Sequence, residues 1–215
     1  MKQFKNYLLI GLIGSSLIFT SCGDDEVPPE EDELEVITDV ALIFTNTANA
    51  SDVVRATAQD PDDDGPLELV IDNDISLTAG ATYTLTFEIL NNIADDPDEQ
   101  NIGAEILEED DEHQIFFEFT AGAFTDPTGN GNVDGTAAGD EAINYEDEDS
   151  DAQDGSGNPV GLQTTWTAGA AQTGSSFRVI LMHQPPVNGV AVKTATSGVN
   201  DGEPDFNLLF NLDIE

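Results

Sequence analysis

Hydrophobic and polar residues alternate along much of the chain, which is the pattern of β-strands with one buried face. The clearest example is 82–89, where four apolar residues, Tyr83, Leu85, Phe87 and Ile89, alternate with threonines and a glutamate. Comparable segments predict further strands at 34–45, 53–58, 67–71, 114–120, 142–145, 160–168, 176–183 and 206–214. Segments rich in Gly, Asp and Asn separate them, as is typical of turns.

One segment, 102–114, has helical periodicity instead, with Ile102, Ile106 and Leu107 on one face. Its acidic C-terminal half opposes the helix dipole, so we expect this helix to be short. Many short strands and little helix predict an all-β fold. We expect an antiparallel β-sandwich, Ig-like or jelly-roll-like, of about 8–10 strands with long acidic loops and at most one short helix.

The first residues have the organisation of an export signal. Lys2 and Lys5 precede an apolar stretch over 7–19, and Thr20 and Ser21 precede Cys22, the only cysteine. The apolar stretch is about 13 residues long, shorter than the roughly 20 that a spanning helix needs. The segment 19–22 (FTSC) resembles a lipobox with Phe at its usual aliphatic position. We therefore interpret 1–21 as a lipoprotein signal peptide and Cys22 as the lipidation site, carrying palmitate-type chains; an ordinary secretory signal is the alternative.

The residues after Cys22 are acidic. The segment 23–26 (GDDE) resembles the signal that directs lipoproteins of Bacteroidota to the outer face of the outer membrane. Residues 22–33 carry many charges and two prolines, so we expect a solvated tether, followed by a single β-sandwich domain over 34–215. The expected location is the outer membrane, with the lipid-anchored domain facing the cell exterior.

The charge balance restricts the partners. Without Lys2 and Lys5 the chain has three basic residues against 44 acidic ones, hence a formal net charge of −41. Nucleic acid and anionic lipid head groups are poor partners for such a chain, since both need clustered Lys and Arg. Divalent cations and basic surfaces are favoured, although solubility in a salty medium explains the charge equally well.

Carboxylates at alternate positions suggest calcium binding near residue 60. Asp60, Asp62 and Asp64 precede Gly65, and such a loop directs oxygens to one point, as Ca²⁺ requires. The twelfth position of an EF-hand would be Ile71, so this is not an EF-hand, but Glu68 could be a substitute ligand. The alternative is a solvated acidic turn.

A second acidic region extends over 126–154. It offers oxygen ligands for Ca²⁺ at short spacing in two groups: Asp126, Asn130, Asn132 and Asp134, then Asp147, Asp149 and Asp151. The alternative interpretation is a flexible acidic loop, because alternation also arises by chance in so acidic a chain.

A third acidic region, 108–113, contains one of two histidines. Glu109 and His113 would share a helix face at i, i+4, and imidazole beside carboxylates can bind zinc or manganese. The alternative is a charged helix end. His183 is interpreted as a half-buried residue at a strand end; a joint site with His113 depends on a distance that the sequence does not give. Trp166 is interpreted as a core residue rather than a sugar-stacking platform.

The sequence carries no enzyme signature. It lacks a cysteine nucleophile, a G-x-S-x-G elbow, an H-E-x-x-H motif and a phosphate-binding glycine loop. We therefore predict a non-enzymatic binding or accessory module whose acidic loops bind calcium. The alternatives are a transition-metal capture protein for uptake, and a carbohydrate-binding adhesin or a hydrolase with paired carboxylates.

Several segments together resemble small outer-surface lipoproteins of flavobacteria and related Bacteroidota, over the whole predicted domain. They are 59–66 (QDPDDDGP), 83–91 (YTLTFEILN), 112–117 (EHQIFF), 158–161 (NPVG) and 205–214. Such proteins often carry the label "type 1 periplasmic binding fold superfamily", which implies a two-lobed α/β fold. The strand pattern and the length depart from that label. The resemblance further implies an outer-membrane TonB-dependent receptor as a candidate partner.

Overall fold

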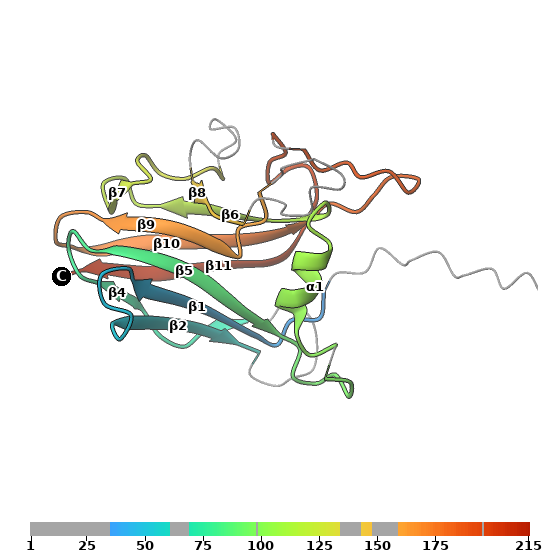
Figure 1. The fold of residues 1–215 in the computed structure, drawn as a ribbon, viewed down its shortest axis with the longest axis horizontal. Helices are drawn as coiled ribbons and strands as arrows, with labels where there is room; N and C mark the ends of the chain where they lie inside the picture. The colour runs from blue at the N-terminus through green and yellow to red at the C-terminus, as the bar shows by residue number, and fades with distance from the viewer. Residues whose placement is uncertain (1–34, 61–68, 98, 134–142, 148–158, 195) are drawn as a thin grey trace, which may run out of the picture. The chain divides into compact units, whose positions relative to one another are not determined.

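The computed structural model describes residues 35–60, 69–97, 99–133, 143–147, 159–194 and 196–215. These residues form two β-sheets that pack together, so the predicted β-sandwich is confirmed (Figure 1). The larger sheet has the order β3 (Val70–Ile71), β2 (Val53–Gln59), β1 (Asp39–Asn46), β5 (Thr82–Leu90), β9 (Gln163–Ala168) and β7 (Phe124–Asp126), and β8 (Asn144–Tyr145) also pairs with β9. The smaller sheet has the order β4 (Ile75–Leu77), β11 (Glu203–Ile214), β10 (Gln172–His183) and β6 (His113–Phe119).

Alternation along the strands sets which face is buried. In β11 the predicted apolar face, Phe206, Leu208, Phe210, Leu212 and Ile214, is buried while the residues between them are mostly exposed. Because side chains on a strand point to opposite faces in turn, each sheet contributes one apolar face to a common core.

The centre of this core is aromatic. Phe117 of β6 lies with its ring centroid 5.3 Å from that of Trp166 in β9 and 5.9 Å from that of Phe177 in β10. These rings join the two sheets in edge-to-face and tilted arrangements, which aromatic pairs prefer. Trp166 is fully buried, and its indole Nε1 donates to Thr164 Oγ1 at 2.7 Å. The interpretation of Trp166 as a core residue is therefore confirmed.

Three features of the fold differ from the sequence prediction. The pair of β4 and β11 is parallel, so the smaller sheet is mixed rather than antiparallel. β4 and β7 were not expected, because three residues are too few to show alternation. The helix α1 (Ile102–Glu108) ends six residues before the predicted end at 114, where the acidic residues begin.

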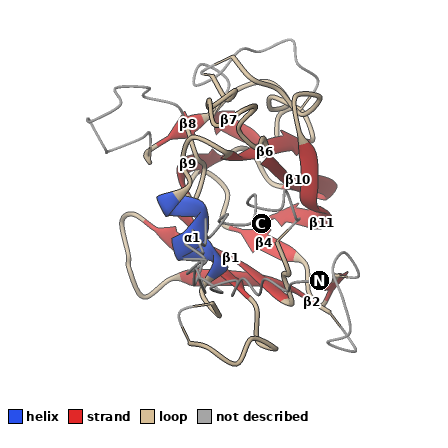
Figure 2. Cartoon of the chain, turned by 90° about the vertical axis from the view of Figure 1, so that its right-hand side faces the viewer, coloured by secondary structure: helices blue, strands red, loops and turns tan. Residues whose placement is uncertain are grey.

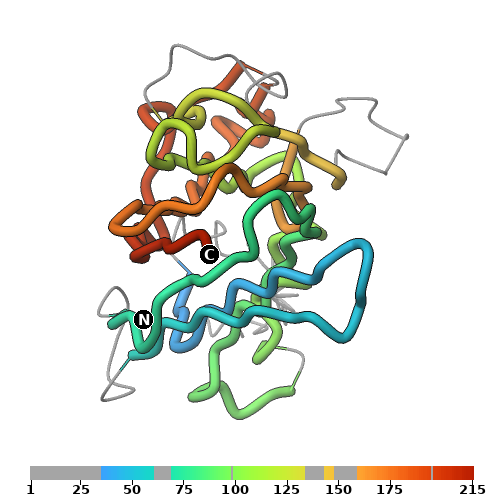
Figure 3. The backbone as a smooth tube through the Cα atoms, turned by 90° about the vertical axis from the view of Figure 1, so that its left-hand side faces the viewer, coloured from blue at the N-terminus to red at the C-terminus, as the bar shows by residue number. Residues whose placement is uncertain are grey.

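The helix lies at one end of the sandwich (Figure 2), where it contacts β5. Its N-cap is Asn101, whose Oδ1 accepts a hydrogen bond from the backbone N–H of Ala104 at 3.2 Å. Ile102 and Ile106 are buried and face the core, whereas Leu107 is exposed. Figure 3, from the opposite end, shows the strands of the two sheets with the C-terminus between them.

Candidate metal centre

The histidines meet at the helix end of the smaller sheet. The strand register places His113 of β6 opposite His183 of β10, and His183 opposite Glu203 of β11. The two imidazole rings stack, with centroids 4.6 Å apart and an interplanar angle of 12°. The tertiary structure therefore brings together the two histidines that the sequence leaves seventy positions apart.

His113 lies between two carboxylates. Its side chain is fully buried, with Nδ1 3.5 Å from Glu109 Oε2 and Nε2 3.8 Å from Asp205 Oδ2. Among the described residues, neither ring nitrogen has a hydrogen-bond partner. A neutral imidazole has one N–H and one lone pair, so one nitrogen directs its lone pair at a carboxylate oxygen. A proton or a metal ion between the two groups removes that repulsion.

The end of the helix α1 determines where the Glu109 carboxylate lies. α1 ends at the C-cap Glu109, whose backbone N–H donates to the carbonyl of Glu105 at 2.9 Å. One more turn follows, in which the His113 N–H donates to the Glu109 carbonyl at 3.1 Å. This turn keeps the i, i+4 relation that the sequence predicted, so Glu109 and His113 do lie together.

A β-bulge supplies the second carboxylate. Leu181 pairs with Phe206 and Met182 pairs with Pro204, so Asp205 is an extra residue on β11 without a partner on β10. Bulges redirect side chains and are frequent beside functional sites. Here the bulge accompanies burial of the Asp205 carboxylate, which is 1% exposed.

The Asp205 side chain also binds the backbone of a third acidic residue, Glu35. Its Oδ1 accepts a hydrogen bond from the backbone N–H of Glu35 at 3.3 Å. One ligand atom from each of Glu35, Glu109 and His113 then lies within 4.8 Å of the others. Sequence reasoning missed Glu35 and Asp205, because neither the bulge nor the contact over 170 positions leaves a local signal.

Burial shifts the pKa values of the cluster toward neutral forms. Desolvation, reinforced by the charges of Glu105, Asp205 and Glu109, raises the pKa of Glu35 to about 7. Desolvation raises the pKa of Asp205 to about 6, and it lowers the pKa of His113 to about 3 with help from His183. A site that disfavours its own negative charge without a counterion is suited to a divalent cation.

Metal-free protein is expected to lose stability as pH rises through the pKa of Glu35. A raised folded-state pKa favours folding below the unfolded value of 4.5, and this contribution disappears as pH passes about 7. His113 acts in the opposite direction, and its effect fades as pH rises past its unfolded value of 6.5, while Asp205, with its pKa raised to about 6, acts in the same direction as Glu35. Between pH 6.5 and 8 we therefore expect a loss of about 0.5–1 kcal/mol, allowing for partial exposure of Glu35.

Urea unfolding in EDTA at the two pH values measures this loss, and Glu35→Gln should reduce it. An equal loss in the wild type and in Glu35→Gln would contradict the assignment.

The remaining sequence-predicted ligands lie elsewhere. Asp60 directly follows β2, and its backbone N–H donates to Thr38 O at 2.8 Å; Asp62, Asp64 and Glu68 lie outside the described residues. Asp134, Asp149 and Asp151 also lie outside them, as does Cys22. Calcium binding at these positions stays a prediction.

Three described members of the second acidic region make structural contacts. Asn132 is buried, with Oδ1 accepting from the Phe117 N–H at 2.9 Å and Nδ2 donating to the Tyr145 hydroxyl at 2.9 Å. Asp147 accepts from the backbone N–H groups of Gly161 and Gln163 at 3.0 and 2.9 Å. Asp126 accepts from Asn144 Nδ2 at 3.1 Å. These side chains therefore fix loops to the sheets.

Asn130 contributes through its backbone, since its carbonyl accepts from the Phe119 N–H at 3.0 Å, and its side chain is exposed.

The chain matches no protein-family model, no curated protein and no solved structure. Within the described residues, no helix combines the length and apolarity required to cross a bilayer.

Proposed function

We propose that this protein is a non-enzymatic module that captures a divalent transition-metal ion through Glu35, Glu109 and His113. The observation that supports this most is the fully buried His113, whose ring nitrogens face carboxylates and make no hydrogen bond among the described residues. A buried imidazole of this kind is rare unless it has a ligand, because unsatisfied polar atoms in a core are destabilising.

The donor set favours zinc or manganese. Imidazole nitrogen suits zinc, iron, copper and nickel, whereas carboxylate oxygen suits manganese and also zinc. The 3.5 Å between His113 Nδ1 and Glu109 Oε2 is close to the separation of about 3.4 Å between two ligands of one tetrahedral Zn²⁺. Three protein ligands leave a position open for water or a further donor.

The ion can reach the site from solvent along the helix end. The Glu109 side chain is 43% exposed while His113 is fully buried, so the cluster has one open and one enclosed side. This arrangement supports capture and release of an ion rather than a permanently enclosed structural metal.

Titration with ZnCl₂ and MnCl₂ in a calorimeter tests the proposal. We expect one ion per chain and at least a tenfold weaker affinity in Glu109→Gln, equivalent to about 1.4 kcal/mol. Glu108→Gln is the matched control, because Glu108 is the neighbouring exposed residue and loses the same charge. Equal weakening by both substitutions would mean diffuse attraction by an acidic surface and would contradict the site.

Thermal unfolding tests metal binding without relying on the heat of binding measured in the calorimeter. At a hundredfold excess of ion over Kd, binding to the folded state alone adds about 2.7 kcal/mol of stability. Zinc should therefore raise the melting temperature of the wild type but not of Glu109→Gln. A rise with CaCl₂ that persists in Glu109→Gln would instead support the acidic loops around Asp60 and Asp126.

The proposed setting for capture is the cell surface. The basis is the sequence of residues 1–33 alone: a lipobox-like segment ending at Cys22, an acidic signal and a charged tether. A lipid anchor would hold the metal-binding domain beside an outer-membrane receptor that imports the ion. Mass spectrometry of native material for acylated Cys22 tests the anchor separately from metal binding.

A further inference from the structure

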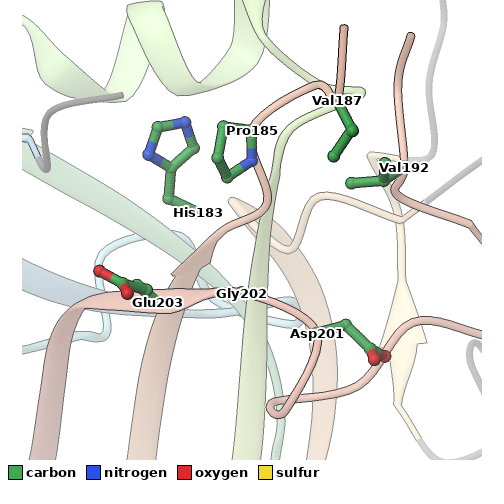
Figure 4. Close-up of a pocket in the computed structure, with 7 residues that line it drawn as sticks. All are labelled: His183, Pro185, Val187, Val192, Asp201, Gly202 and Glu203. Carbon is green, nitrogen blue, oxygen red and sulfur yellow. The ribbon is translucent and has the colours of Figure 1, made fainter. Parts of the chain in front are cut away.

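Residues 185–194, in the connection from β10 to β11, form an arm that projects from the helix end of the sandwich (Figure 1). Val187 and Val192, from the two sides of this arm, lie together beside Pro185 (Figure 4). The backbones of Val187 and Val190 exchange two hydrogen bonds, at 3.0 and 3.3 Å. The two residues between them, Asn188 and Gly189, therefore form the tip of the arm.

Both residues at the tip have a left-handed backbone. The φ angles of Asn188 and Gly189 are 57° and 71°, as a two-residue type I′ hairpin turn requires. Asn-Gly favours this turn because glycine, and to a lesser degree asparagine, tolerate positive φ. The same dipeptide is chemically labile, since glycine has no side chain to keep its backbone nitrogen away from the amide carbon of the preceding asparagine.

The fold leaves the two reacting groups of the tip accessible. Asn188 and Gly189 are exposed, and a Cβ atom on Gly189 would meet no atom within 4 Å. In the described part of the chain, neither the Asn188 side chain nor the Gly189 N–H has a hydrogen-bond partner. The hydrogen bonds between Val187 and Val190 are what opposes rotation of the peptide between Asn188 and Gly189, and exposed hydrogen bonds at a loop tip open readily.

The chain contains one other Asn-Gly pair, Asn130-Gly131, and the fold restrains it. The Asn130 carbonyl accepts from the Phe119 N–H at 3.0 Å, and the Asn132 N–H donates to the Phe117 carbonyl at 2.8 Å. Gly131 is buried, and a Cβ atom there would lie 1.9 Å from the Phe117 carbonyl oxygen. Rotation of this peptide would break hydrogen bonds on both sides and collide with β6. The protein thus holds the same dipeptide once accessible and once restrained.

We infer that Asn188 is a site of spontaneous deamidation, with water as the co-reactant. The backbone nitrogen of Gly189 forms a bond to Cγ of Asn188, and the bond from Cγ to Nδ2 breaks. The proton that Gly189 loses leaves with Nδ2 as ammonia. Water then opens the cyclic imide at one of its two carbonyl carbons. One opening gives aspartate, and the other gives isoaspartate, in which the main chain runs through Cγ; no group is oxidised or reduced.

The two products affect the arm differently. Aspartate adds one negative charge and keeps the turn, since Asp-Gly also favours type I′. Isoaspartate adds one carbon to the main chain, so Val187 and Val190 no longer have the spacing for both hydrogen bonds. The end of the arm stays attached, because the buried Lys193 donates to the His113 carbonyl at 2.5 Å. Deamidation therefore makes the tip more acidic and less ordered, and leaves the proposed metal ligands in place.

Peptide mapping by mass spectrometry, after incubation of the whole chain in mildly alkaline buffer, tests this inference. Trypsin releases 179–193, which contains Asn188, and a glutamate-specific protease releases 119–141, which contains Asn130. In folded protein, 179–193 should gain one mass unit at least tenfold faster than 119–141, with isoaspartate among the products. In urea, where the fold no longer restrains Asn130, the two rates should agree within threefold.

Asn188→Gln is the matched control, because it keeps the amide but lengthens the side chain by one methylene, so the five-membered imide cannot form. In this variant 179–193 should keep its mass. Equal rates at Asn188 and Asn130 in folded protein would overturn the inference. So would an unmodified Asn188 after a time in which the urea-unfolded chain reacts completely, or an equal mass gain in Asn188→Gln. None of these measurements involves a metal ion, so their outcome is independent of the proposed function.

Discussion

Replacing Asp205 with asparagine is expected to weaken zinc binding 10- to 100-fold, although Asp205 is not one of the three proposed ligands. Its Oδ2 faces Nε2 of His113 at 3.8 Å, on the side of the ring away from Glu109. A carboxylate there favours the proton on Nε2 and leaves the Nδ1 lone pair for the metal. Second-sphere partners of this kind typically contribute 10- to 100-fold to affinity.

Asparagine is chosen because it separates the two roles of Asp205. Its remaining oxygen can still accept from the Glu35 N–H, whereas its amide group can no longer accept a proton from Nε2. Nitrogen chemical shifts of the His113 ring should move toward the Nδ1–H tautomer, which a purely structural defect would not cause. Calorimetry then gives the loss in zinc affinity.

Asp213→Asn is the matched control for this experiment. Asp213 lies on the same strand and also accepts a backbone hydrogen bond, from Gly174 at 2.9 Å. Unchanged zinc affinity in Asp205→Asn, or an equal loss in both variants, would refute the proposed role of Asp205.

Replacing Phe117 with alanine is expected to destabilise the fold by about 3–5 kcal/mol, the usual range for removing a buried phenylalanine. Its ring is fully buried and lies within 6.3 Å of four other rings, those of Phe87, Tyr145, Trp166 and Phe177. These rings come from both sheets, so the cavity would form where the sheets meet. Equilibrium unfolding in urea gives the change in free energy.

Leu209→Ala, on β11 of the same sheet, provides the comparison. Leu209 is 52% exposed, so its truncation should change stability by no more than about 0.5 kcal/mol. A loss below about 1 kcal/mol for Phe117→Ala would mean that the aromatic cluster collapses around the missing ring, contrary to the close packing expected of a protein interior.

The sequence predicted the strands well where alternation is long. β5 and β11 have nine and twelve residues, and the expected apolar face of each is buried, with Phe87 of β5 partly buried. β4 has three residues, and its parallel pairing with β11 depends on how the sheets assemble. Short segments carry too few positions to distinguish a strand from a loop.

Two residues of the candidate site could be predicted from the sequence, and the other two could not. The pair Glu109 and His113 follows from spacing along one helical turn, which is local information. Glu35 and Asp205 join them through a bulge and a contact across 170 positions, and no local pattern encodes either. The stacking of His113 on His183 likewise depends on the register of β6 against β10, which sequence alone leaves open.

The parallel pairing of β4 with β11 has a consequence for folding kinetics. Ile75 must find Leu212, and β11 is an inner strand of its sheet, so this sheet stays incomplete until distant segments have met. Closing such long loops costs conformational entropy before native contacts can offset it, and this cost slows folding. β-sandwiches accordingly fold in roughly milliseconds to seconds. The polypeptide is therefore expected to reach its native state more slowly than a helical bundle of equal size would.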